Sequence, residues 1–159
     1  MAVADGLGSG PEEAEAAMSC ISTGLERPLH EMFATLDAQL CDTHGVALAI
    51  AAVEIDSWNM SIASVGNIRT VLLKESGEYH MRNTSGIVGA GYDQLISDTR
   101  ILSPGDVLAL YSDGLDAYFA LRETLEIAAL SSLDMARTVL DRWARVGEDA
   151  AILICRHEA

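Results

Sequence analysis

Four short segments typical of β-strands follow one another between residues 45 and 82, and they constrain the fold more than any other feature of the chain. They are separated by short spacers of Asp, Asn, Ser and Gly, the residues that tight turns favour. Consecutive antiparallel hairpins are therefore predicted, with the strands at residues 45–54, 58–65, 68–74 and 78–82.

Helical patterns lie on both sides of these strands. Pro11 and three early glutamates suit the start of a helix that runs to about residue 23. Apolar residues at steps of three and four predict a second helix over residues 27–41, and similar patterns predict helices over 116–129 and 133–145, the last ending near Gly147. Because helices and strands segregate along the chain, the predicted fold class is α+β with antiparallel sheet.

Length and charge narrow the function classes. The 159 residues, half of them hydrophobic, suffice for one domain with a core of its own. The longest apolar run, residues 46–53, is far shorter than the roughly 20 residues that span a bilayer, and we see no leader, so we expect a cytoplasmic protein. A formal charge of −14 opposes nucleic acid and anionic membranes as partners. The three cysteines have neither disulfide-framework nor zinc-site spacing.

Three apolar runs have an acidic residue at one end. Asp5 follows Ala2-Val3-Ala4, Asp113 comes shortly after the run 107–110, and the pair Glu148-Asp149 precedes the run 150–154. Carboxylates at strand ends are ligands for hard cations, and a ligand set made only of oxygen favours Mg²⁺ or Mn²⁺ over zinc. If these strand ends meet, they form one metal site.

Other interpretations of the polar residues are weaker. The glycines near the start do not form a nucleotide-binding fingerprint. Ser112 has no evident His/Asp partner for a serine hydrolase. Asn67 and Asp106 are expected in turns, His44 is expected to be structural, and His157 is expected to be exposed.

The ordered set of motifs resembles the 2C-type metal-dependent Ser/Thr phosphatases, and within them the small bacterial branch related to SpoIIE and RsbX. The resemblance covers almost the whole chain. It is carried by these segments: Asp5-Gly6-Leu7-Gly8-Ser9-Gly10, Thr43-His44-Gly45-Val46, Gly66-Asn67, Pro104-Gly105-Asp106, Ser112-Asp113-Gly114-Leu115 and Glu148-Asp149.

This resemblance implies an αββα sandwich, a four-layer arrangement of two antiparallel sheets flanked by helices, with two Mn²⁺ or Mg²⁺ ions in a cleft at one end. Asp5 would bridge the ions, the carbonyl group of Gly6 would bind one of them, and Asp113 with an acid of the last loop would bind the other. Two such ions activate water for in-line attack on a phosphoryl group. Asp5 and Asp113 are thus the expected catalytic residues.

The chain departs from the family pattern in the last motif and at its beginning. The family has Asp where register places Glu148, so either Glu148 or Asp149 is the ligand, and we favour Glu148. Family members also have a pair of strands before the strand that ends at Asp5, and this pair supplies another acidic residue to the metal site. We therefore expect residues 1–159 to form a single phosphatase domain shortened at its amino end. The open sheet edge beside Ala2–Ala4 could pair with a second copy in a homodimer.

The function that the resemblance implies is hydrolysis of phosphoserine or phosphothreonine on a bacterial STAS-domain regulator of the stressosome type. One alternative is a catalytically impaired module that binds a phosphorylatable regulator or its kinase. Another is a small-molecule phosphatase that uses the same ions.

Overall fold

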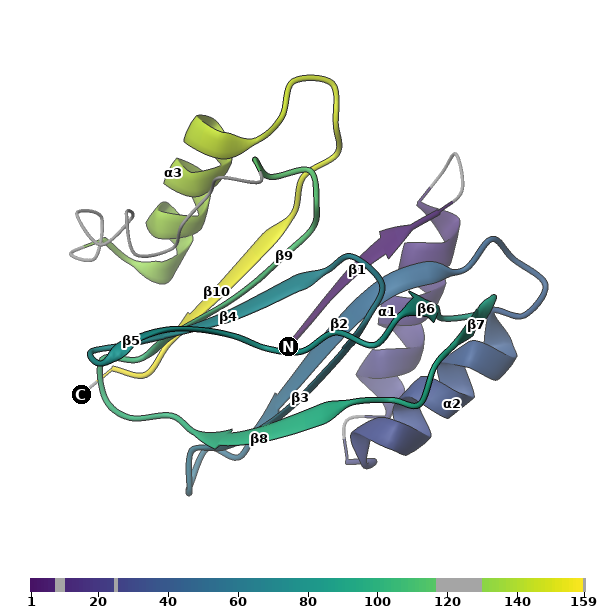
Figure 1. Ribbon diagram of the computed structural model, residues 1–159, viewed down its shortest axis with the longest axis horizontal. Coiled ribbons are helices and arrows are strands. Elements are labelled where there is room, and N and C mark those ends of the chain that lie inside the picture. The colour runs from purple at the N-terminus through teal and green to yellow at the C-terminus, as the bar shows by residue number, and fades with distance from the viewer. Residues whose placement is uncertain (8–10, 25, 117–129, 159) are drawn as a thin grey trace.

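Two antiparallel sheets stack face to face, with helices on both outer sides (Figure 1). The computed structural model describes residues 1–7, 11–24, 26–116 and 130–158. One sheet has the strand order β1-β2-β3-β8 and the other β10-β9-β4-β5, while β6 and β7 form a small ribbon. The bounds of the strands are β1 Ala2–Gly6, β2 Val46–Val53, β3 Asn59–Val65, β4 Arg69–Lys74, β5 Gly77–His80, β6 Gly86–Ile87, β7 Gly91–Tyr92, β8 Ser97–Ile101, β9 Val107–Tyr111 and β10 Ile152–Arg156.

Three apolar clusters fill the spaces between the four layers. The first packs helices α1 (Glu12–Thr23) and α2 (Leu29–Gln39) on the β1-β2-β3-β8 sheet around Phe33. The second lies between the two sheets around Leu108. The third packs helix α3 (Ser132–Trp143) on the outer face of the other sheet around Met135. This confirms the predicted αββα sandwich.

The predicted run of hairpins is wrong at one turn. Strands β2 and β3 pair as expected, but β3 and β4 belong to different sheets, so the Gly66-Asn67 turn carries the chain across the sandwich. Gly66 has a φ of 89° and lies so close to Ala47 that a side chain would collide with it. This backbone crosses between layers where a two-residue hairpin would have folded back within one sheet.

The described helices follow the predictions with shifts at their ends. Helices α1 and α2 lie inside the expected ranges, and Pro11 stands at the N-cap of α1. Helix α3 is capped by Ser131, whose hydroxyl accepts a hydrogen bond from the backbone of Asp134. It ends at Trp143, before the predicted Gly147. The helix predicted over 116–129 lies almost entirely outside the described residues. No helix within the described ranges has the length and apolar character needed to cross a membrane.

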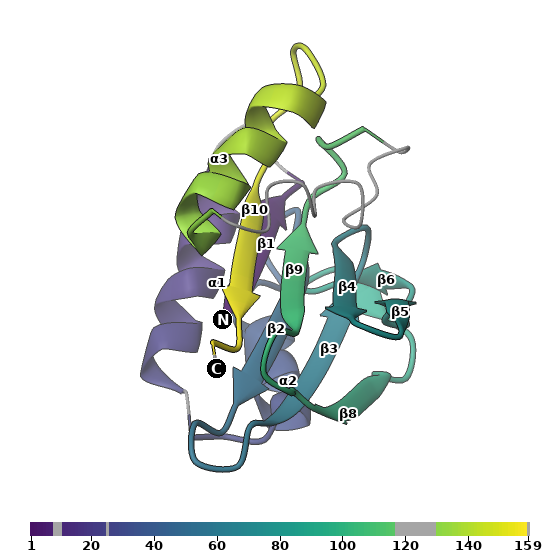
Figure 2. The same cartoon turned by 90° about the vertical axis from the view of Figure 1, so that its left-hand side faces the viewer.

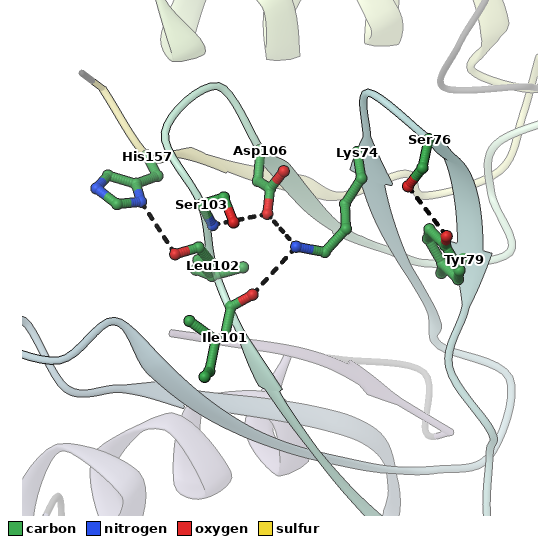
Figure 3. A network of polar contacts seen from close by, with 8 residues as sticks. All are labelled: Lys74, Ser76, Tyr79, Ile101, Leu102, Ser103, Asp106 and His157. Atoms are coloured by element: carbon green, nitrogen blue, oxygen red, sulfur yellow. Dashed lines mark hydrogen bonds and ion pairs between the residues drawn. The ribbon is translucent and has the colours of Figure 1, made fainter.

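A polar network joins the two sheets at the end where β9 begins (Figure 3). Asp106 accepts hydrogen bonds from the backbone N–H of Ser103 at 2.8 Å and from the Lys74 ammonium group at 2.5 Å. The Lys74 side chain also donates to the carbonyl oxygen of Ile101, the last residue of β8 in the opposite sheet. Asp106 therefore completes a turn, as predicted, and also pairs with β4.

His157 is buried, which contradicts its predicted exposure. Its ring stacks on Trp58 with the centroids 3.6 Å apart, and its Nδ1 lies 3.2 Å from the carbonyl oxygen of Leu102. Its backbone N–H donates to the carbonyl oxygen of Asp106. The last residues of the chain are thereby fixed to the turn between β8 and β9.

Candidate metal centre

The three acid-bearing strand ends lie at one end of the sandwich, uppermost in Figure 2. Strands β1 and β9 both end there, and β10 begins there because it pairs antiparallel with β9. Strand β1 contacts both β9 and β10 across the space between the sheets. Residues of the two sheets can therefore contribute to one site.

Asp5 points toward the opposite sheet. Side chains alternate along a strand, and Ala2 and Ala4 pack against the helices whereas Val3 belongs to the cluster between the sheets. Asp5 has the same parity as Val3, so its half-buried carboxylate lies at the end of the inter-sheet face.

The loops that carry Asp113 and Asp149 are in backbone contact. A Cβ atom at Gly114 would lie 2.8 Å from the carbonyl carbon of Asp149 and closer still to its oxygen. The ends of the strands are also held by Ser112, whose N–H donates to the carbonyl oxygen of Ala151 and whose hydroxyl accepts from the Ala151 N–H, both at 3.0 Å. The spacing of Asp113 and Asp149 therefore depends on this close approach.

The charges of the two sheets meet at Asp5. Partial burial raises the pKa of the Asp5 carboxyl, and the negative charges of Asp113 and Asp149 raise it further. The three aspartates are thus close enough to interact, and they lie on the strand ends that the sequence indicated.

Gly6 is half-buried at the end of β1, where it pairs with Val46 of β2. The next residue, Leu7, donates its N–H to the carbonyl oxygen of Gly45 at 3.1 Å. The turn that follows Asp5 is thus bound to the start of β2. Gly8, Ser9 and Gly10 lie outside the described residues.

Glu148 and Asp149 differ in their surroundings. Glu148 lies in the turn after α3, where its N–H donates to the carbonyl oxygen of Arg145 at 3.2 Å, and its side chain is exposed. Asp149 lies against Gly114 and its charge reaches Asp5. Both side chains are exposed, so the two acids differ in the contact of the Asp149 backbone with Gly114 and in the effect of the Asp149 charge on Asp5.

The donor set suits hydrated cations. Across the part of the chain that the structure describes, no three Asp, Glu, His or Cys side chains come close enough together to enclose one ion. Mg²⁺ and Mn²⁺ prefer oxygen ligands, and Mg²⁺ in particular keeps several waters and needs only one or two carboxylates from the protein. The described carboxylates at this end of the sandwich are oxygen donors of the kind that these ions prefer.

Asn83 was not identified from the sequence, and its side chain makes several hydrogen bonds near this site. Its amide group donates to the carbonyl oxygens of Gly66 and Ile68, and its Oδ1 accepts a hydrogen bond from the Ser64 hydroxyl. These bonds hold the crossing turn between β3 and β4, which lies at the same end of the sandwich as the acids. No local pattern distinguishes this Asn from one in an exposed loop.

His44 lies near the site but on the helix side of its sheet. Its ring Nδ1 is 3.3 Å from Oε1 of Glu13, whose side chain is only 8% exposed. The Glu13 carboxylate accepts hydrogen bonds from the backbone N–H of Glu13 and from the His44 ring, and these bonds hold the pKa of Glu13 below its usual value. The pair ties the start of α1 to the start of β2, in agreement with a structural role for His44.

Comparisons with known proteins agree with this arrangement. Residues 1–158 match the family described as Stage II sporulation protein E (SpoIIE). A solved structure from the bacterial stressosome, a modular system adapted to control secondary messenger signaling, has a TM-score of 0.90 and 26% identity, over 98% of this chain and 83% of the other. No curated protein matches significantly.

Two further structures share the fold at lower identity. RsbX in complex with magnesium has a TM-score of 0.82 and 22% identity, over 96% of this chain and 77% of RsbX. The serine/threonine phosphatase PstP/Ppp of Mycobacterium tuberculosis has a TM-score of 0.77 and 14% identity, over 99% of this chain and 88% of the other. With its sandwich fold and its match over almost the full length, the chain belongs to the SpoIIE family and is similar to RsbX and to 2C-type serine/threonine phosphatases.

Proposed function

We propose that this protein is a metal-dependent phosphatase that hydrolyses phosphoserine or phosphothreonine on a bacterial STAS-domain regulator in the cytoplasm. The observation that carries the proposal is the position of Asp5 on one sheet within reach of the charges of Asp113 and Asp149 on the other. Family membership and the stressosome and RsbX relatives support the reaction and the type of substrate.

In this mechanism the aspartates and Gly6 provide the oxygen ligands. Asp5, at the end of the face between the two sheets, would hold the cations together with the carbonyl oxygen of Gly6 and the carboxylates of Asp113 and Asp149. The bound Mg²⁺ or Mn²⁺ pair would supply a nucleophilic water at neutral pH and offset the charge of the phosphoryl group. The close approach of Gly114 to the backbone of Asp149 would set the spacing of Asp113 and Asp149.

The choice between Asp149 and Glu148 as ligand rests on their surroundings. We propose Asp149, because its charge acts on Asp5 and its backbone lies against Gly114, next to Asp113. Replacing each by Asn or Gln and measuring Mn²⁺ affinity by calorimetry distinguishes them. A loss of affinity in Glu148→Gln alone would assign the role to Glu148.

A catalytically impaired module is the second candidate, and one observation favours it. Among the described residues no three ligating side chains lie close enough to enclose a single ion. Such a protein would bind a phosphorylated regulator without turnover.

The two candidates are separated by incubating the purified protein with phosphorylated STAS-domain proteins and Mn²⁺, and by measuring the inorganic phosphate released. Release that is abolished in Asp113→Asn supports the enzyme, because that substitution removes a ligand charge. Binding of the phosphoprotein without release of phosphate supports the module. Release from unrelated phosphopeptides but never from STAS-domain proteins refutes the proposed substrate class.

The homodimer stays a prediction. Among the described residues β1 pairs with β2 alone, so its other edge is open. Light scattering coupled to size exclusion gives the molar mass in solution, and a monomer at all concentrations would contradict pairing through this edge.

A further inference from the structure

Arg145 lies between the two loops that carry the acids of the second sheet. Its backbone N–H donates to the carbonyl oxygen of Gly114 at 2.8 Å, and its own carbonyl oxygen accepts from the N–H of Glu148 at 3.2 Å. The neighbouring residues Ala144 and Leu115 form a β-bridge. The backbone of Arg145 is thus fixed beside both Asp113 and Asp149.

The guanidinium group of Arg145 lies beside the backbone of Asp113. Its Nη1 lies 3.4 Å from the carbonyl oxygen of Asp113, and the side chain is exposed. Within the described ranges, no ion pair involves Arg145, whereas Lys74, Arg82 and Arg137 each pair with an aspartate. Most of the guanidinium donors therefore remain available to a ligand.

Arg145 is a positive residue in strongly negative surroundings. The chain has a net charge of −14, and Asp5, Asp113, Glu148 and Asp149 all lie at this end of the sandwich. A phosphate dianion that approaches these carboxylates is repelled unless positive groups offset them. Guanidinium offers two parallel N–H donors in a geometry that matches two phosphate oxygens.

We propose that Arg145 binds the phosphoryl group of the substrate, by donating hydrogen bonds from its guanidinium group to phosphoryl oxygens while the acids of the two sheets hold the cations. This inference rests on the proposed phosphatase function and names the residue that recognises its substrate. The ligand class is a phosphate monoester or inorganic phosphate.

The test compares Arg145→Ala and Arg145→Lys with Arg137→Ala, which removes one positive charge from the outer side of α3, in a residue that pairs with Asp134. Each variant is assayed with Mn²⁺ and p-nitrophenyl phosphate, with inorganic phosphate as inhibitor. We expect Arg145→Ala to lower kcat/KM and weaken inhibition by phosphate, each by about 10- to 100-fold, the range for charge-assisted hydrogen bonds. Arg145→Lys recovers part of this, because lysine provides charge without the paired donors. Arg137→Ala behaves as the wild type.

Mn²⁺ affinity, measured by calorimetry, distinguishes phosphate binding from loop positioning. The inference predicts equal Mn²⁺ affinity in the wild type and Arg145→Ala. It is overturned if Arg145→Ala matches Arg137→Ala in the phosphate assays, or if Mn²⁺ affinity falls as much as the rate.

Failure of the proposed function has a different signature. If the wild type binds Mn²⁺ but releases no phosphate from any monoester, the phosphatase proposal is refuted. Titration of inorganic phosphate into the Mn²⁺-loaded protein then decides the role of Arg145. Weaker binding by Arg145→Ala supports it, and equal binding, or no binding by the wild type, overturns it.

Discussion

Replacing Gly114 by Ala should separate the two acid-bearing loops while leaving the rest of the fold in place. The new Cβ would lie 2.8 Å from the carbonyl carbon of Asp149 and 2.9 Å from Cα of Ala150, with the carbonyl oxygen nearer still. These are backbone atoms, so no side chain can rotate away. The φ of Gly114 is outside the left-handed region, so the strain is steric alone.

The size of the effect follows from the overlap. Real Cβ atoms essentially never approach a heavy atom closer than 3.0 Å, so the Asp149 loop must retreat by about 1 Å. Overpacking of this kind costs about 1–3 kcal/mol of stability, and each kcal/mol lowers Tm by about 2–4 °C in a chain of this size. A displacement of about 1 Å at a reacting site can reduce the rate by about 100-fold.

The assay measures Mn²⁺ affinity by calorimetry and turnover of p-nitrophenyl phosphate, with Gly24→Ala as the matched control. A Cβ at Gly24 would meet nothing closer than 3.6 Å, and its φ of −120° suits any residue. We expect Gly114→Ala to lose affinity and turnover while Gly24→Ala retains both. Unchanged Mn²⁺ affinity in a folded Gly114→Ala protein would refute the argument that this contact sets the spacing of Asp113 and Asp149.

Three further predictions concern charge. Asp5→Asn should raise the Tm of the metal-free protein, because burial and the charges of Asp113 and Asp149 disfavour ionised Asp5, and it should remove the stabilisation by Mn²⁺. Scanning fluorimetry in EDTA and in Mn²⁺ measures both effects. A lower Tm of the variant in EDTA would contradict the prediction. Because the pKa of Asp5 is raised on folding, the contribution of Asp5 to the stability of the metal-free protein is greatest below the pKa of an unfolded aspartate and is lost as pH rises through the raised pKa. Protons should compete with Mn²⁺ over the same pH window. Urea unfolding and Mn²⁺ titration against pH test this, and Asp5→Asn should lack the Asp5 part of both pH dependences. Lys74→Met should destabilise the fold by about 2 kcal/mol in urea unfolding, since it leaves Asp106 buried without its ammonium partner. It should not change Mn²⁺ affinity, because Lys74 and Asp106 lie where β9 begins and the acids lie where β9 ends.

The strand ends could be predicted because their signals are local. Strand β9 is a continuous apolar run that begins after a Pro-Gly-Asp turn, and Asp113 follows it within two residues. Strand β1 is short, but the glycine after Asp5 marks its end. The same locality explains why the three described helices were predicted with errors only at their ends.

The sheet to which a strand belongs could not be predicted in the same way. The Gly66-Asn67 turn looks like a hairpin turn, and only the partners of β3 and β4 reveal that it crosses the sandwich. Strand β8, with the sequence Ser-Asp-Thr-Arg-Ile, has no apolar alternation, because four of its five residues are exposed. Strand β8 is therefore defined by its pairing with β3 and not by a pattern in its own sequence.

Contacts between distant residues account for the other differences. His157 is buried because Trp58 stacks on it, and no spacing in the sequence connects the two. The positions of Glu148 and Asp149 depend on the turn that begins at Arg145 and on the approach of Gly114. Sequence register could place either acid at the site.

The two ends of the sandwich hold their sheets together by opposite means. Where β9 begins, the hydrogen bond from Lys74 to the carbonyl oxygen of Ile101 and the stack of His157 on Trp58 need no ligand. Where β9 ends, Asp5 faces the like charges of Asp113 and Asp149. Local opening in chelator should therefore start at the acidic end, and amide hydrogens of Ser112 and Ala151 should exchange with solvent sooner than that of His157. The concentration of free cations would then control how often the two sheets separate at the acidic end, independently of any substrate.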